Sequence, residues 1–199
     1  MMRNRLAAVV LWALGMLIAG CVSTPESRFF TLNATLNHAV ETSSLSVVVG
    51  PVSVPAAVDR PQIVVTTGPN QVRVDDYNRW ASPLQSGISR VVADNLVSLL
   101  GTPRVTIFPQ TLSANADYQA AVEVQSFGSA LGEAATLDAV WTVRRVKDGK
   151  QQVGRTTVRE PASERGYDAL AAAHSRAVAR LSQDIADAVR ALDGLGQPR

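Results

Sequence analysis

Two segments of the chain repeat apolar residues at three- and four-residue spacing, and this pattern most constrains the fold. It predicts one helix over 83–100 and a second over 167–192, each with an apolar stripe along one side. Ser82 is the expected N-cap of the first helix, with Pro83 at the first helical position. Gly101 is the expected stop. Each helix therefore needs an apolar surface to cover.

The segments between these helices carry the patterns of β-strands. Alternation is clearest over 135–146, and the β-branched run at 45–54 is typical of a strand buried on both faces. Turn sequences at 68–70 and 147–150 predict two hairpins. The polar strand 151–159 is expected either to be solvated on one face or to lie at a sheet edge. The other expected strands are 28–32, 62–66, 71–74, 105–108 and 117–127. The order of elements predicts an α+β fold, in which two amphipathic helices cover a mixed, largely antiparallel sheet.

The N-terminus has the features of an export signal. Arg3 and Arg5 precede fourteen uncharged residues, 6–19, which is short for a transmembrane helix. Two small residues then lead directly to Cys21, the only cysteine, as in a bacterial lipobox. We therefore expect residues 1–20 to be a signal peptide that is removed. Cys21 is then lipidated with acyl chains such as palmitate, which anchor the chain to a membrane.

The lipid anchor is followed by a short tether and one domain. Residues 21–27 form the lipidated cysteine and tether, and 28–199 form the single folded domain. The six residues after the cysteine reach at most about 20 Å, so the domain must lie close to its membrane. Val22 stands where an aspartate would favour inner-membrane retention in enterobacterial-type sorting. This position therefore favours the outer membrane, with the domain in the periplasm.

Composition excludes several classes of protein. One cysteine rules out an intramolecular disulfide, and two histidines leave little material for a zinc site. Without Arg3 and Arg5, the chain has 17 basic and 17 acidic residues, so it has no broad electrostatic reason to bind nucleic acid. The P-loop and nucleophile-elbow patterns are absent from the sequence. No cofactor or metal is expected.

Candidate contact residues lie around the first predicted hairpin. Pro61 fixes the backbone before a strand, and Arg60 either braces this corner through backbone carbonyls or contacts a partner. Arg79 and Trp80 come just before the first helix. Trp80 is expected to pack in the core, although tryptophan is also common in binding sites, and Arg79 is expected to contribute to partner docking. Trp141 alternates with apolar neighbours and is expected in the core.

A set of short motifs extends over the chain after the tether. They are Gly50-Pro51-Val52-x-Val54-Pro55, Asp59-Arg60-Pro61-Gln62-Ile63-Val64, Arg79-Trp80-x-x-Pro83-Leu84, Leu137-Asp138-Ala139-x-Trp141, Ala173-His174-Ser175 and Leu181-x-x-Asp184-Ile185-Ala186. Together they resemble the PqiC/YmbA-type lipoproteins, also described as ABC-type transport auxiliary lipoprotein components. Residues 56–58 depart from the family, which often has a tyrosine and a leucine there, so no aromatic contact is carried over to this loop.

The resemblance implies an accessory lipoprotein that is not an enzyme. Such proteins work with an MCE-type tunnel protein and inner-membrane transport components, and the system moves lipids or other hydrophobic molecules and supports envelope integrity. Two other classes stay open: a carrier that binds lipid in its own cavity, and an envelope hydrolase that uses His174 or an acidic pair in an open cleft. His174 lies on the apolar stripe of the second helix, so we interpret it as a hydrogen-bonded histidine at the core margin. A homo-oligomer is also compatible with the sequence.

Overall fold

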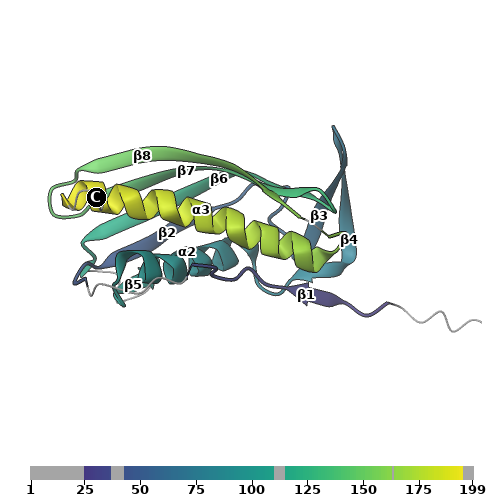
Figure 1. Cartoon of the computed structure of the whole chain (residues 1–199), viewed down its shortest axis with the longest axis horizontal. Helices are drawn as coiled ribbons and strands as arrows, with labels where there is room; N and C mark the ends of the chain where they lie inside the picture. The colour runs from purple at the N-terminus through teal and green to yellow at the C-terminus, as the bar shows by residue number, and fades with distance from the viewer. Residues whose placement is uncertain (1–24, 37–42, 110–114, 163, 195–199) are drawn as a thin grey trace, which may run out of the picture.

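The computed structural model describes residues 25–36, 43–109, 115–162 and 164–194 (Figure 1). The segment predicted to be a signal peptide, Cys21 and His38 lie outside these residues. The elements in chain order are β1 (Arg28–Phe30), β2 (Val47–Ser53), β3 (Gln62–Gly68), β4 (Gln71–Trp80), α2 (Leu84–Leu100), β5 (Val105–Ile107), β6 (Tyr118–Ala130), β7 (Ala134–Arg145), β8 (Gln151–Pro161) and α3 (Tyr167–Asp193). The predicted α+β class is confirmed.

The larger sheet has five strands in the order β5-β2-β6-β7-β8. β2 pairs in parallel with β5 and β6, whereas β6, β7 and β8 are antiparallel, so the sheet is mixed as predicted. Both helices cover one face of it: α2 packs on β2 and β5, α3 packs on β7 and β8, and the helices contact each other (Figure 1). β8 is an edge strand, which is one of the two placements that its polar sequence indicated.

A second sheet of three strands, in the order β1-β4-β3, lies at one end of the molecule (Figure 1). The sequence did not indicate that these three strands form a sheet of their own. β1 pairs in parallel with the end of β4, from Arg28 opposite Asn78 to Phe30 opposite Trp80. A strand of three residues has too little pattern to indicate its distant partner. The hairpin predicted at 68–70 does join β3 and β4.

The start of α2 differs from the prediction by one position. Pro83 is extended, with φ −49° and ψ 132°, and no side chain caps this helix. The carbonyl of Pro83 accepts the first helical bond from the Gly87 amide, at 3.0 Å, so Pro83 occupies the N-cap position expected for Ser82. The predicted stop is confirmed, because Gly101 adopts a left-handed conformation with φ 64°.

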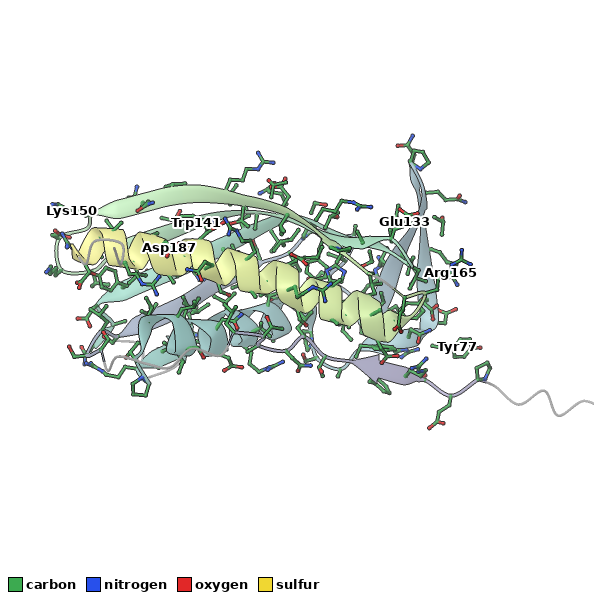
Figure 2. All side chains as sticks on the ribbon, viewed as in Figure 1. Tyr77, Glu133, Trp141, Lys150, Arg165 and Asp187 are labelled. Atoms are coloured by element: carbon green, nitrogen blue, oxygen red, sulfur yellow. The ribbon has the colours of Figure 1, made fainter. Side chains whose placement is uncertain are left out.

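Trp141 lies in the core between the large sheet and α3 (Figure 2), as predicted, with 6% of its surface exposed. Its ring covers Gly154 on β8, where a Cβ atom would lie only 2.2 Å from the ring. The indole N–H donates to the Thr156 hydroxyl at 3.0 Å, and that hydroxyl donates to Asp184 on α3 at 2.6 Å. The glycine makes room for the ring, and the hydrogen bonds satisfy its polar edge.

Candidate functional site

The candidate arginines come together at the base of the β3–β4 hairpin. Arg79 pairs with Gln62 across the strands, and the Trp80 amide donates to the Pro61 carbonyl at 2.7 Å. Since Arg60 directly precedes Pro61, the fold brings this loop beside the end of β4. The sequence placed these residues 19 positions apart, and strand pairing makes them neighbours.

The two arginines make different contacts from those predicted. The Arg60 side chain is exposed and has no hydrogen bond among the described residues. Backbone groups hold its corner instead, because the amides of Val58 and Asp59 both donate to the Pro55 carbonyl. The expectation that Arg60 braces the loop is therefore wrong. Arg79 is half-buried, and its Nε donates to the Asp76 carbonyl at 2.9 Å.

Trp80 is buried in an aromatic cluster at the same end of the fold. Its ring centroid lies 6.1 Å from Phe127 on β6 and 5.9 Å from His174 on α3, with both contacts edge-on. Phe127 and His174 stack at 3.9 Å with an interplanar angle of 9°. The packing role expected of Trp80 is confirmed, and this cluster joins the small sheet to β6 and α3.

Ser129 and His174 form a pair that resembles part of a hydrolytic triad. The Ser129 Oγ lies 2.8 Å from His174 Nε2. However, His174 is fully buried, Ser129 is 3% exposed, and the other ring nitrogen of His174 has no partner among the described residues. Burial lowers the pKa of His174 to about 3, which leaves it a weak base. A hydrolase needs a carboxylate behind the histidine and access for substrate, so this arrangement is structural. His174 lies deeper than the core margin predicted.

Asp75 organises the contact between the hairpin and α3, and sequence reasoning missed it. It lies at a break in the β3–β4 register and is 8% exposed. Its carboxylate accepts hydrogen bonds from the Tyr77 amide at 3.0 Å, from the amide and side chain of Asn78, and from the Tyr167 hydroxyl at 2.6 Å. The backbone bonds to residues two and three positions ahead form a local turn that an Asp-x-Tyr-Asn sequence could have indicated.

These hydrogen bonds control the charge of Asp75. Burial raises its pKa, but the bonds from Tyr167, Asn78 and Tyr77 outweigh burial, so the pKa falls from 3.8 to about 2. For Tyr167, burial and the bond to Asp75 both raise the pKa, to about 12. The pair is therefore a fixed carboxylate and a neutral phenol at neutral pH, which is suited to holding structure together and not to proton transfer.

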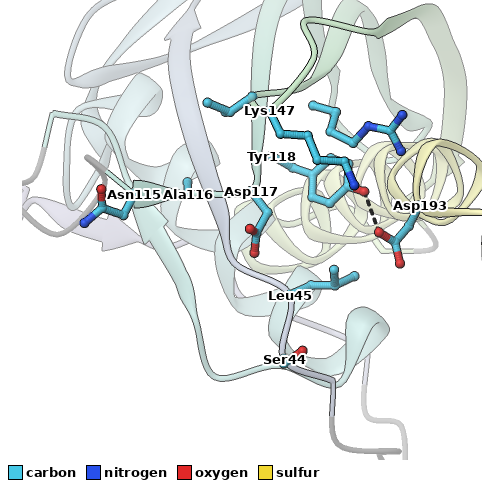
Figure 3. A pocket seen from close by; sticks show the side chains of 10 residues that line it. Ser44, Leu45, Asn115, Ala116, Asp117, Tyr118, Lys147 and Asp193 are labelled. Carbon is cyan, nitrogen blue, oxygen red and sulfur yellow. Dashed lines mark hydrogen bonds between the residues drawn. The ribbon is translucent and has the colours of Figure 1, made fainter.

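A hollow of about 440 Å³ lies near the opposite end of the molecule, between the starts of β2 and β6 and the end of α3 (Figure 3). Across it, the Tyr118 hydroxyl donates to Asp193 at 2.7 Å. Burial and this bond raise the pKa of Tyr118 to about 12, so the phenol remains a hydrogen-bond donor. Asp117, Arg145 and Lys147 also line the hollow. A lining with four charged residues does not suit an acyl chain.

The charged groups of this hollow are largely engaged within the protein. The hydroxyl and amide of Ser46 donate to Asp117 at 2.7 and 2.8 Å, and these bonds lower its pKa. Arg145 binds Asp148 through Nε and Nη2 and also reaches the Leu192 carbonyl. Over the described parts of the chain, no group of three or more His, Cys, Asp or Glu residues could hold a metal ion. No helix in those parts is long and apolar enough to cross a membrane.

The comparison with known families decides the identity of the fold. The sequence model of the ABC-type transport auxiliary lipoprotein component family matches residues 30–186. The chain belongs to this family. The match begins at the end of β1 and ends within α3, so it covers both sheets and the hairpin base that carries Arg60 and Arg79.

Two solved structures share this fold. One is XCC0632 from Xanthomonas campestris, described as a DUF330 protein, with 20% identity and a TM-score of 0.69 over 85% of this chain and 97% of its own. The other is described as an uncharacterized protein, with 21% identity and a TM-score of 0.67 over 81% of this chain and 97% of its own. At this identity, both indicate the fold of the family member and nothing more. No curated protein sequence matches the chain significantly.

Proposed function

We propose that this family member is a lipoprotein anchored in the outer membrane through Cys21. There it serves as the periplasmic accessory component of an MCE-type intermembrane transport system. Its role is to dock the tunnel protein at the membrane, in concert with inner-membrane transport components, during transfer of lipids or other hydrophobic molecules. The family match over residues 30–186 carries the proposal, together with the lipobox that ends in the only cysteine.

The geometry favours a docking protein over the two alternatives. A lipid carrier needs a large apolar cavity, and the hollow beside Tyr118 is lined by charged groups. An envelope hydrolase needs an accessible nucleophile and base, and Ser129 and His174 are buried in the core. Docking requires exposed side chains on a rigid support, which the loop at the hairpin base provides.

Of the two predicted contact residues, Arg60 is the better candidate for binding the tunnel protein. Its guanidinium is exposed and has no hydrogen bond among the described residues, so all its donors can reach a partner carboxylate. Arg79 already uses its Nε on the Asp76 carbonyl. Arg79 therefore has a smaller share in partner binding than the sequence suggested.

Affinity purification of the lipidated protein from native membranes tests the proposal. We expect an MCE-domain protein to co-purify with the wild type and to be reduced by Arg60→Glu, which reverses a local charge. Arg144→Glu is the matched control, because Arg144 is also exposed and makes no side-chain hydrogen bond among the described residues. Both variants should keep the wild-type melting temperature. Recovery of transport proteins without an MCE protein, or of none, would contradict the proposed partner.

A further inference from the structure

The small sheet has one buried face and one exposed apolar face. Phe30, Ile63, Val65 and Trp80 lie on the inner side, and all four are buried. The strand register places Phe29 beside Arg79, Val74 opposite Val64, and Val72 opposite Thr66, which puts these residues on the other side. We call this side, with Phe29, Val72, Val74 and Arg79, the outer face.

Exposed apolar surface is concentrated on this sheet. Phe29 is 63% exposed, Val72 is 61% and Val74 is 37%. Tyr77, at the register break of β4, is 39% exposed. Among the described residues, eight large apolar side chains are exposed, and these four of them belong to the small sheet. A cluster of this kind on a small protein indicates a contact surface.

The place where the N-terminal tether joins the fold indicates what covers the outer face. β1 begins at Arg28, seven positions after Cys21, so Phe29 belongs to the first structured segment after the anchor. The six tether residues reach at most about 20 Å, which holds the small sheet near the lipid. In Figure 1 the chain leaves the molecule at the end where β1, β3 and β4 lie. Figure 2 shows Tyr77 at this end and Lys150 at the opposite one.

We infer that the outer face of the small sheet rests on the bilayer in which Cys21 is anchored. The inference relies on the membrane attachment stated in the proposed function and extends it to the orientation of the domain. Phe29, Val72 and Val74 enter the boundary between headgroups and acyl chains. The amphipathic side chains of Tyr77 and Arg79 place their polar ends among the lipid phosphates and carbonyls.

The contact with the bilayer gives the Arg79 guanidinium a binding partner that the hairpin base alone does not provide. Its Nε is held by the Asp76 carbonyl, which fixes the guanidinium on the outer face, while its two terminal nitrogens have no hydrogen bond among the described residues. A planar guanidinium with available N–H groups matches a lipid phosphate. Arg60 remains the residue proposed for the protein partner.

The orientation also places the two ends of the molecule. α3 extends from the end with the small sheet to the end with the hollow (Figure 1). Its 27 residues correspond to a length of about 40 Å. With the outer face on the bilayer, the turn between β7 and β8 and the hollow beside Tyr118 point away from the membrane.

Fluorescence with lipid-borne quenchers tests the inference on the full lipidated chain. Cys21 is the only native cysteine. In the proposed lipoprotein its thiol carries the lipid, so Val72→Cys gives a single site for an environment-sensitive label. Val153→Cys is the matched control, because Val153 on β8 is 60% exposed, almost the same as Val72. Both proteins are reconstituted into vesicles of phosphatidylethanolamine and phosphatidylglycerol that contain doxyl-labelled lipid.

We expect lipid quenching to be at least about threefold stronger at position 72 than at position 153, since an inserted face lies within the doxyl region. Equal quenching at the two positions would overturn the inference. A label at 72 that is shielded from iodide in water but not quenched by lipid would overturn it in favour of a second copy or a protein partner. If the protein does not float with the vesicles, the membrane attachment in the proposed function is contradicted. If it floats but lipid does not quench the label, only the inferred orientation is contradicted.

Discussion

Replacing Asp75 by asparagine tests how the hairpin is held to α3. The carboxylate is buried and accepts a hydrogen bond from the Tyr167 hydroxyl at 2.6 Å and three more from Tyr77 and Asn78. Asparagine keeps the shape and one acceptor oxygen but loses the charge. Its amide nitrogen is a hydrogen-bond donor, and it would face other donors at a position where the carboxylate has an acceptor oxygen. The variant therefore removes the charged hydrogen bonds with little change in packing.

The pKa of Asp75 gives the expected magnitude. A shift from 3.8 in the unfolded chain to about 2 in the folded protein corresponds to about 2 kcal/mol of the free energy of unfolding. Because the folded-state pKa is the lower one, this stabilisation is fully present above about pH 5 and is lost as the pH falls towards 2. We expect Asp75→Asn to cost about 2 kcal/mol at pH 7 and about half of that at pH 3.

Urea-induced unfolding followed by tryptophan fluorescence at pH 7, 5 and 3 measures this difference. Comparing the variant with the wild type at each pH cancels the contributions of other titrating groups, including His174. Asp76→Asn is the matched control, because the Asp76 side chain is exposed and only its backbone carbonyl is used. A cost for Asp75→Asn that stays constant with pH, or an equal cost for the control, would refute the electrostatic reasoning.

Three further predictions concern the core and the anchor. Trp141→Ala should lower the free energy of unfolding by about 3–5 kcal/mol. Gly154→Ala should lower it by about 1–3 kcal/mol, because the new Cβ would overlap the Trp141 ring. Urea titration measures both changes, and unchanged unfolding midpoints would contradict this packing. Cys21→Ser should move the protein to the soluble fraction in membrane fractionation without changing its melting temperature; continued pelleting with its partner absent would contradict the anchor. Unfolded His174 takes up a proton near pH 6.5 but the folded residue only near pH 3, so stability should fall over this range as the pH drops. His174→Gln should reduce that slope in unfolding titrations, and an unchanged slope would contradict it.

The sequence predicted most elements because their hydrophobic periods are long. The predicted helices, 83–100 and 167–192, differ from α2 and α3 by at most one residue at each end. The polar sequence of 151–159 indicated a strand solvated on one face or at an edge, and β8 lies at the edge of the large sheet. Local periodicity was sufficient in these segments because each contributes one face to the core.

Pairings between distant segments could not be read in the same way. β1 has three residues, and its pairing with β4 depends on the closing of a long loop. The partnership of Asp75 with Tyr167 joins positions 92 residues apart, although the turn that Asp75 makes with its neighbours is local and has a sequence signature. Around Arg60, the sequence indicated a corner in the backbone. It did not indicate that the backbone amides of Val58 and Asp59 already donate to the Pro55 carbonyl there.

The two ends of α3 are fastened by the same chemical pair. At its start, the hydroxyl of Tyr167 binds Asp75 on the hairpin, and at its end Asp193 accepts the hydroxyl of Tyr118 on β6. The helix between them is continuous, so tension along it is carried by its own backbone hydrogen bonds, while its packing on β7 and β8 fastens it to the large sheet along its length. A pull from an assembly on one end would therefore reach the other end without a soft hinge. Mechanical unfolding of the domain should begin by rupture of one of these two bonds, before the large sheet separates.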